Sequence, residues 1–220
     1  MTRTGMHRLT LNDLPLLLQI QAQTLPDTLS ARLGSRFNVL FHQSMLNEDQ
    51  YLCYACFVDG SPVGYLSCTP DSQSLLRSAV RRQMPRYVAT LAYALLSNAR
   101  LWGLASRIAF SVVTGRGEPA RDVGAELLSF GVLPSFRGRK TAPDGTHTSV
   151  AGTLVQRALE SLHERGSRSV KACVVPDDET ANAFFRKHGF DFESRIRRFG
   201  LTANLYVHRL DPPIAAPSGG

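Results

Sequence analysis

The sequence predicts an α/β fold, and three observations lead to it. Strand-like and helix-like segments alternate from residue 125 onward, two apolar runs before residue 71 flank a turn, and residues 72–118 look helical with no strand signal. The chain has 220 residues, of which 43% are hydrophobic and 20% charged, and this excludes a coiled coil, a collagen-like chain and wholesale disorder. We expect a single domain over residues 1–210 with a helical insertion at 72–118.

The N-terminal part predicts two helices and a hairpin. Apolar residues recur at helical spacing over residues 11–23, and a second helix is expected over residues 30–46. Apolar runs at 51–58 and 62–68 flank an Asp-Gly-Ser turn at residues 59–61, which is typical of a β-hairpin.

The segment that follows differs in kind. It predicts helices at residues 74–86 and 87–111, and residues 72–121 hold eight Arg against one acid, Glu118. Its open roles are to cover the core, to form a lid or a contact between two copies of the chain, to bind an anionic acceptor, or to lie on a membrane surface. A membrane-spanning helix is not expected, because the charge-free apolar stretch at 87–99 has 13 residues against about 20 needed.

The second half reads as alternating elements. In order they are a strand at 125–133, a polar stretch at 134–148, a helix from 150 that Gly166 closes, a strand at 169–175, a helix that begins at the acids 177–179 and ends at Gly189, and strands at 190–199 and 201–210. The tail at 211–220 is rich in Pro, Ala, Ser and Gly and is expected to be disordered.

The composition predicts a cytoplasmic protein with reduced thiols. The four cysteines are irregularly spaced, and the N-terminus lacks the apolar region and cleavage site of a signal peptide. Cys53 and Cys56 lie on a predicted strand at a spacing that turns them to opposite faces, so no metal site is expected. The net charge of +7 is concentrated in residues 72–121, so nucleic-acid binding is not expected.

The junction between the strand at 125–133 and the next helix carries a candidate binding site. Arg137, Gly138 and Arg139 lie there, where unpaired N–H groups and the positive end of a helix dipole suit a pyrophosphate. A basic surface loop is the competing interpretation.

The motifs together resemble the GCN5-related N-acetyltransferase (GNAT) superfamily. The resemblance rests on the apolar strand that ends at Leu133-Pro134, on Arg137-Gly138-Arg139, and on the run from Ala181 to Phe190, which ends in Phe-Phe-Arg-Lys-His-Gly-Phe; it is close over residues 125–192. It implies a mixed central sheet flanked by helices, with acetyl-CoA bound between splayed central strands.

The resemblance also implies cofactor-binding residues. These are Val132 and Leu133 for the pantetheine arm, Arg137, Gly138, Arg139, Ser149, Val150 and Ala151 for the pyrophosphate, and Asn182 and Phe185 on the last helix. The chain departs from the family pattern in four places: residues 140–148 read as an insertion, Ser149 stands where Gly is usual, Asp178 stands where Asn is frequent, and Phe185 stands where Tyr is usual.

Glu126 is the candidate catalytic residue. It is the only charge in its apolar strand and lies where several family members have a general base. An amine must lose a proton before or during acyl transfer, so a carboxylate at this place suits the chemistry. A structural ion pair is the alternative role.

These inferences lead to one functional hypothesis and two alternatives. The hypothesis is an enzyme that transfers an acetyl group from acetyl-CoA to a primary amine of a small molecule, such as an amino sugar, by direct attack in a ternary complex. The alternatives are an acyl-CoA-binding module without catalysis and a nucleic-acid-binding protein. The sequence leaves open the acceptor, the acyl-chain length, the choice between N- and O-acylation, the general acid and the oligomeric state.

Overall fold

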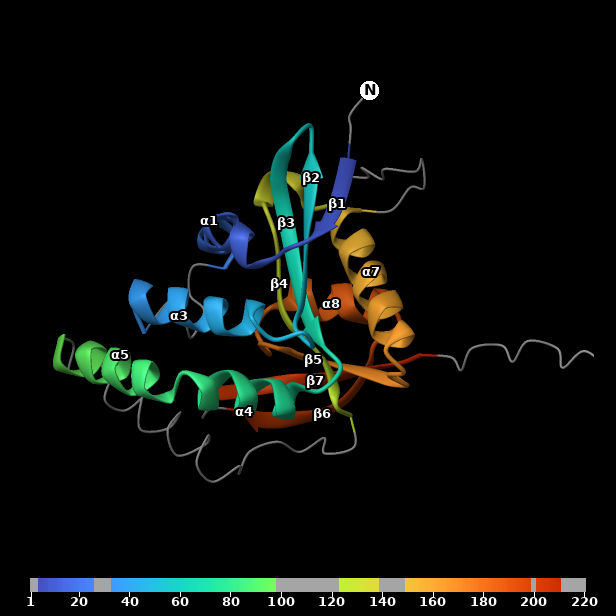
Figure 1. The fold of residues 1–220 in the computed structure, drawn as a ribbon. Coiled ribbons are helices and arrows are strands. Elements are labelled where there is room, and N and C mark those ends of the chain that lie inside the picture. Colours follow the sequence, from blue (N-terminus) through green and yellow to red (C-terminus); the bar gives the residue numbers. More distant parts are fainter. Residues whose placement is uncertain (1–3, 26–32, 98–122, 139–148, 199–200, 211–220) are drawn as a thin grey trace, which may run out of the picture.

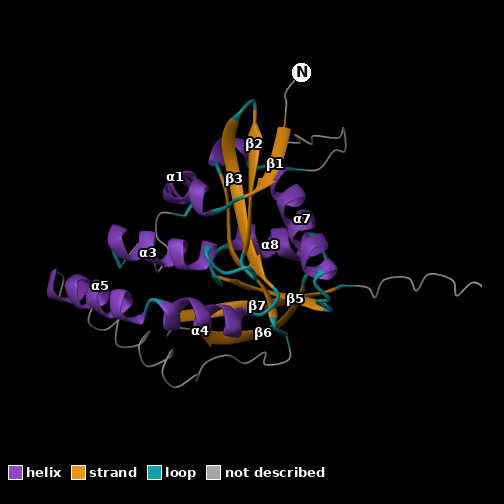
Figure 2. Cartoon of the chain, in the orientation of Figure 1, coloured by secondary structure: helices purple, strands orange, loops and turns teal. Residues whose placement is uncertain are grey.

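In a computed structural model of the chain, a single mixed sheet runs through the molecule with helices on both faces (Figures 1 and 2). The structure describes residues 4–25, 33–97, 123–138, 149–198 and 201–210. Within these ranges the sheet has seven strands in the order β1-β2-β3-β4-β5-β7-β6. This confirms the predicted α/β class and the mixed central sheet.

The elements have the following bounds. The strands are β1 (Thr4–Arg8), β2 (Leu52–Val58), β3 (Ser61–Thr69), β4 (Ala125–Val132), β5 (Ser169–Val174), β6 (Asp191–Arg198) and β7 (Leu201–Arg209). The helices are α1 (Leu14–Thr24), α3 (Ser35–Leu46), α4 (Ser72–Arg82), α5 (Met84–Ser97), α7 (Val150–Glu164) and α8 (Glu179–Lys187), with 3₁₀ turns at Leu11–Asp13 and Pro134–Phe136.

The sheet consists of two antiparallel parts joined by one parallel pair. β1 to β4 pair antiparallel in chain order, and β5, β7 and β6 form a second antiparallel set. The parts meet where β4 pairs parallel with β5 over Ala125, Glu126 and Leu127 alone. Because β4 continues to Val132, its last five residues diverge from β5.

Two hydrophobic cores lie on opposite faces of the sheet. Leu17 and Ile20 of α1 and Met45 of α3 pack on one face with the β3 residue Tyr65. On the other face α7 and α8 pack over the central strands, with α7 contributing buried residues at helical spacing, namely Val150, Leu154, Val155, Ala158 and Leu162. In Figure 1 these helix pairs lie to the two sides of the sheet.

Most predicted elements occur close to their expected positions, with two corrections. β1, an edge strand, was not predicted from the sequence. The break between the first two helices of the insertion was expected after Arg86, but it lies at Gln83, because Pro85 has no N–H to donate and therefore fits the first turn of a helix. Residues 98–118 of the predicted insertion and the tail at 211–220 lie outside the described residues.

Helices α4 and α5 extend from the α3 side of the molecule (Figure 1). Asp71 caps α4 by accepting hydrogen bonds from the backbone N–H groups of Gln73 and Ser74, both at 3.0 Å. Leu75 and Ala79 of α4 are buried in the same core as α1. No helix in the described part of the chain is both long and apolar enough to cross a bilayer.

Candidate active site

The divergence of β4 from β5 creates an open backbone edge in the middle of the sheet. Beyond Leu127, no described strand pairs with β4 on this side, so the backbone groups of residues 128–132 that face β5 lack ladder partners there. Extended chains bind well to such edges, because N–H and C=O groups alternate along them. An amide-containing arm such as pantetheine fits this edge.

The predicted pyrophosphate loop begins where β4 ends. Gly138 has φ +74°, a left-handed conformation that favours glycine, and the Arg137 Nε donates to the Val132 carbonyl at 3.1 Å. Ser149 caps α7 by accepting from the Gly152 N–H at 3.1 Å. The N–H groups and the positive dipole end at the start of a helix suit an anion, and anion binding here stays a prediction. Arg139 lies outside the described residues.

Among the other residues predicted here to bind the acyl donor, some are buried or hydrogen-bonded within the fold and others are partly exposed. The Leu133 N–H donates to the Val63 carbonyl at 2.8 Å and so prolongs the β3–β4 ladder. Val132 and Val150 are buried in the core, whereas Leu133 and Ala151 are half-buried. Leu133 and Ala151 therefore have the exposed surface that a ligand contact requires.

Glu126 lies at the point where the two strands separate. Its carboxylate Oε2 is 3.7 Å from the Nζ of Lys171, its register partner on β5, and their side chains are 2% and 4% exposed. The ion pair that was the alternative prediction for Glu126 is therefore present in the structure. Removing one partner from a buried pair leaves an uncompensated charge, so the two residues act as a unit.

Tyr65 and Ser129, which were not predicted as site residues, meet farther along β3 and β4. The β3–β4 register shifts so that Ser67 opposes Ser129 while Cys68 opposes Leu127, which leaves Leu128 in a bulge. The Tyr65 hydroxyl is 2.6 Å from the Ser129 hydroxyl, and burial raises the pKa of Tyr65. The bulge, which turns the strand locally, has no clear sequence signal.

Lys171, by contrast, did carry a sequence signal. It is the only charge within β5, just as Glu126 is the only charge within β4. Two lone opposite charges on adjacent buried strands predict a pair.

Asn182 joins α8 to the sheet by hydrogen bonds. Its Nδ2 donates to the carbonyls of Val175 at 2.9 Å and Asp178 at 2.6 Å, and its Oδ1 accepts from Asn204 Nδ2 at 2.8 Å and the Tyr206 hydroxyl at 2.9 Å. The side chain is therefore engaged at both ends. A hydrogen bond to a cofactor, as the resemblance implied, would have to replace one of these.

Phe185 is packed in an aromatic cluster. Its ring lies 6.4 Å from Phe130 on β4 and 5.1 Å from Phe190, measured between centroids. It is 6% exposed, so it contributes to the core, and its neighbour Phe184 is more accessible. Phe184 stacks on Phe130 with centroids 5.3 Å apart and so connects α8 to the diverging end of β4.

The cysteines follow the predicted geometry. Cys53 is buried in the core under α1 and Cys56 in the core under α7, which confirms that they face opposite sides of the sheet. No cluster of metal-ligating side chains occurs among the described residues.

Residues 17–190 match the model of the acetyltransferase (GNAT) family. The chain belongs to this family. The match runs from α1 to Phe190, so it covers β2 to β5 with the open edge of β4 and the Glu126–Lys171 pair, and it leaves out β1, β6 and β7. The expectation of acetyl-CoA as acyl donor is confirmed at the level of the family.

Solved structures with the same fold share little sequence with the chain. A polyamine N-acetyltransferase from Drosophila melanogaster has a TM-score of 0.61 at 13% identity, with 94% of this chain and 100% of that chain covered. A ribosomal-protein-alanine N-acetyltransferase from Brucella melitensis has 0.55 at 19%, with 94% and 99% covered. NAA60 from Arabidopsis thaliana, solved with acetyl-CoA, has 0.56 at 15%, with 94% and 98% covered.

The TM-scores show a common fold, and at identities of 13–19% the fold does not identify the acceptor. No curated protein matches the sequence.

Proposed function

We propose that the protein is an N-acetyltransferase that transfers the acetyl group of acetyl-CoA to a primary amine of a small molecule by direct attack in a ternary complex. The observation that carries the proposal is the open edge of β4 with the Glu126–Lys171 pair at its base. The solved structures of similar fold include an agmatine N-acetyltransferase and a polyamine N-acetyltransferase, and the acceptors in these names are small amines. The cytoplasmic location remains a prediction.

The residues have distinct roles in this proposal. The edge at residues 128–132 and the loop around Gly138 bind the donor, so that the acetyl carbon lies near the bulge at Leu128. The amine nitrogen bonds to that carbon, the carbon–sulfur bond breaks, and CoA leaves as a thiolate. Glu126 accepts the amine proton directly or through water, and Lys171 positions the carboxylate. A backbone N–H at the bulge stabilises the oxyanion.

The experiment is a panel of primary amines with acetyl-CoA, scored by release of free thiol. Glu126→Gln should lower kcat by about a hundredfold to ten-thousandfold, because loss of a general base has that effect, while CoA affinity changes little. Glu160→Gln is a matched control, since Glu160 is an exposed α7 residue paired with Arg157 at 3.5 Å. Unchanged turnover of Glu126→Gln across the pH range would remove Glu126 from the mechanism.

The acyl-CoA-binding module without catalysis remains the alternative. It is favoured by Phe185, which has no hydroxyl to protonate the leaving thiolate. Binding of CoA without thiol release on any amine would support the module, and failure to bind CoA at millimolar concentration would contradict both proposals.

A further inference from the structure

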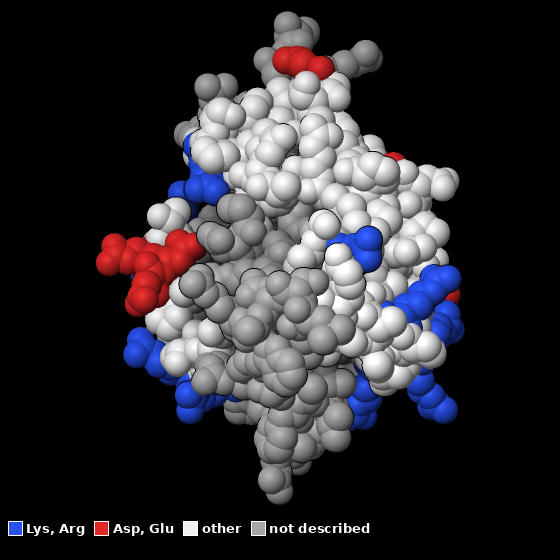
Figure 3. Space-filling view, turned by 90° about the vertical axis from the view of Figure 1, so that its left-hand side faces the viewer, with Lys and Arg blue, Asp and Glu red and all other residues white. Residues whose placement is uncertain are grey.

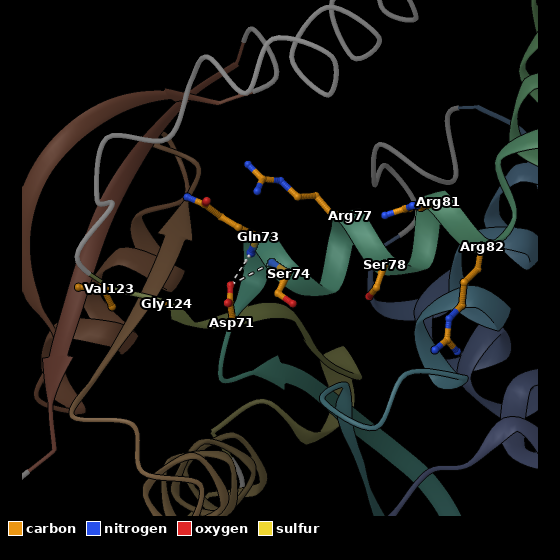
Figure 4. A pocket seen from close by; sticks show the side chains of 9 residues that line it. All are labelled: Asp71, Gln73, Ser74, Arg77, Ser78, Arg81, Arg82, Val123 and Gly124. Carbon is orange, nitrogen blue, oxygen red and sulfur yellow. Dashed lines mark hydrogen bonds between the residues drawn. The ribbon is translucent and has the colours of Figure 1, made fainter.

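A hollow lies at the end of the sheet where β4 begins, beside α4. It has a volume of about 810 Å³ (Figure 4). Its lining comes from α4, from the residue before it and from the chain that leads into β4, namely Asp71, Gln73, Ser74, Arg77, Ser78, Arg81, Arg82, Val123 and Gly124. The volume suits a small molecule.

The charge on this lining is positive. Arg77 and Arg81 are exposed residues one helical turn apart, and they have no charged partner among the described residues. Arg82 differs, because its Nε lies 3.7 Å from the Glu48 carboxylate. In Figure 4 the side chains of Arg77 and Arg81 extend to a different side of α4 from that of Arg82.

The acidic residue of the lining does not neutralise these arginines. The Asp71 carboxylate accepts two backbone hydrogen bonds at the start of α4, a turn or more from Arg77. The sequence around them offers little compensation, since residues 72–121 hold eight Arg and only Glu118 as an acid. On the left-hand side of Figure 1, which Figure 3 turns to the viewer, the lower part displays Lys and Arg but no Asp or Glu among the described residues.

The hollow and the candidate active site lie close to each other along β4. Gly124 lines the hollow and precedes Glu126 by two residues, which is about 7 Å along an extended strand, with both residues on the same face. The Ser72 N–H donates to the Gly124 carbonyl at 3.0 Å and fixes the start of α4 against this strand. A small acceptor of about this length would have its amine near Glu126 and its other end at the hollow.

We propose that the acceptor of this enzyme is a small amine that also carries an anionic group, a phosphate or a carboxylate, which Arg77 and Arg81 bind in the hollow. The assignment rests on the proposed function and adds a substrate class to it. Two guanidinium groups one helical turn apart give such a group several charge-assisted hydrogen bonds. The same charges disfavour polyamines, which are cations.

The test compares amines that differ only in the anionic group. The pairs are O-phosphoethanolamine with ethanolamine and β-alanine with propylamine, and putrescine serves as a cationic amine. We expect kcat/KM to favour the anionic member of at least one pair by about tenfold or more, since hydrogen bonds to charged groups have energies of that size. The two pairs distinguish a phosphate from a carboxylate.

Matched variants connect the preference to the two arginines. Arg77→Gln combined with Arg81→Gln should remove the preference and leave kcat/KM for the neutral amines unchanged. Arg86→Gln is the control, because Arg86 is an exposed α5 residue that does not line the hollow. Equal use of both members of each pair, or a preference that survives the double substitution, would overturn the assignment and leave the acetyltransferase activity standing.

A binding measurement keeps the assignment testable without turnover. Calorimetry with the same amines is done in saturating CoA, so that a phosphate does not report on the donor site. Binding of O-phosphoethanolamine or β-alanine that is lost in the double variant supports the hollow even if no amine is acetylated, in which case the proposed function fails alone. Absence of any such binding overturns the assignment. Acetylation of an acidic peptide also overturns it if none of the small anionic amines is acetylated.

Discussion

Replacing the buried His42 with leucine should stabilise the protein, and the gain should grow as the pH falls. His42 lies on α3 with 2% of its surface exposed, and neither ring nitrogen has a hydrogen-bond partner among the described residues. Its ring packs edge-on against Phe41. Leucine removes two unsatisfied polar atoms and keeps an apolar side chain of similar size at this place.

The magnitude follows from the pKa of His42. Burial lowers this pKa from 6.5 to about 4, because the charged imidazolium is poorly solvated in the core. Between pH 6.5 and about 4, His42 is therefore protonated in the unfolded state but not in the folded state. The free energy of unfolding falls over that range as the pH is lowered. The full loss is about 3 kcal/mol, since each pH unit in the window contributes about 1.4 kcal/mol.

The assay is urea unfolding of wild type and His42→Leu at several pH values from 7.5 to about 3.5. Other groups also titrate in this range, but their effects cancel in the difference between the two proteins. This difference in unfolding free energy should rise from pH 6.5 to about 4 and then level off. His7→Gln, at an exposed histidine, is the control for burial. Parallel loss of stability in wild type and His42→Leu would refute the reasoning.

Two further substitutions test the packing around the site. Gly131→Ala should lower the free energy of unfolding by about 1–3 kcal/mol, measured in urea, because the added Cβ would lie 2.7 Å from the Thr24 Cβ of α1. Gly5→Ala is the control and should be nearly neutral, because a Cβ there meets no atom within 4 Å. Equal effects of the two substitutions would contradict the steric argument. Asn182→Leu should lower the free energy of unfolding by about 2–4 kcal/mol, because it leaves several buried polar groups without their hydrogen-bond partner. Asn47→Leu is the control, since it removes one exposed hydrogen bond. A similar melting temperature for both variants would show that the hydrogen bonds of Asn182 contribute little to stability.

The sequence predicted the elements whose signals are local. The hairpin of β2 and β3 follows from an Asp-Gly turn between apolar runs, and in the structure Asp59 and Gly60 both have positive φ. The apolar spacing of α7 predicted its buried side. β1 was missed because it is an edge strand with largely exposed side chains, and its pairing with β2 is a backbone interaction that leaves no pattern in its sequence.

The candidate site was predicted less completely. Glu126 and the loop at Gly138 could be located, since a lone charge in an apolar strand and a basic glycine turn are visible in the sequence. The partner Lys171 depends on strand order, and the contact of Tyr65 with Ser129 depends on the bulge at Leu128; both are long-range features. Asn182 could be seen as a candidate, but its bonds to Asn204 and Tyr206 join segments that the sequence separates by about twenty residues.

The short parallel seam between β4 and β5 also bears on how the chain reaches its fold. Three residue pairs hold the two antiparallel halves in one sheet, and the middle pair is Glu126 with Lys171. A register shift of one residue would place the Glu126 carboxylate opposite Val170 or Ala172. It would also turn the side chains of the strand to the other face of the sheet, so that an unpaired charge would be buried among apolar side chains. The two opposite charges pair only in the observed register, so this register lets the two halves of the sheet join without burying an unpaired charge.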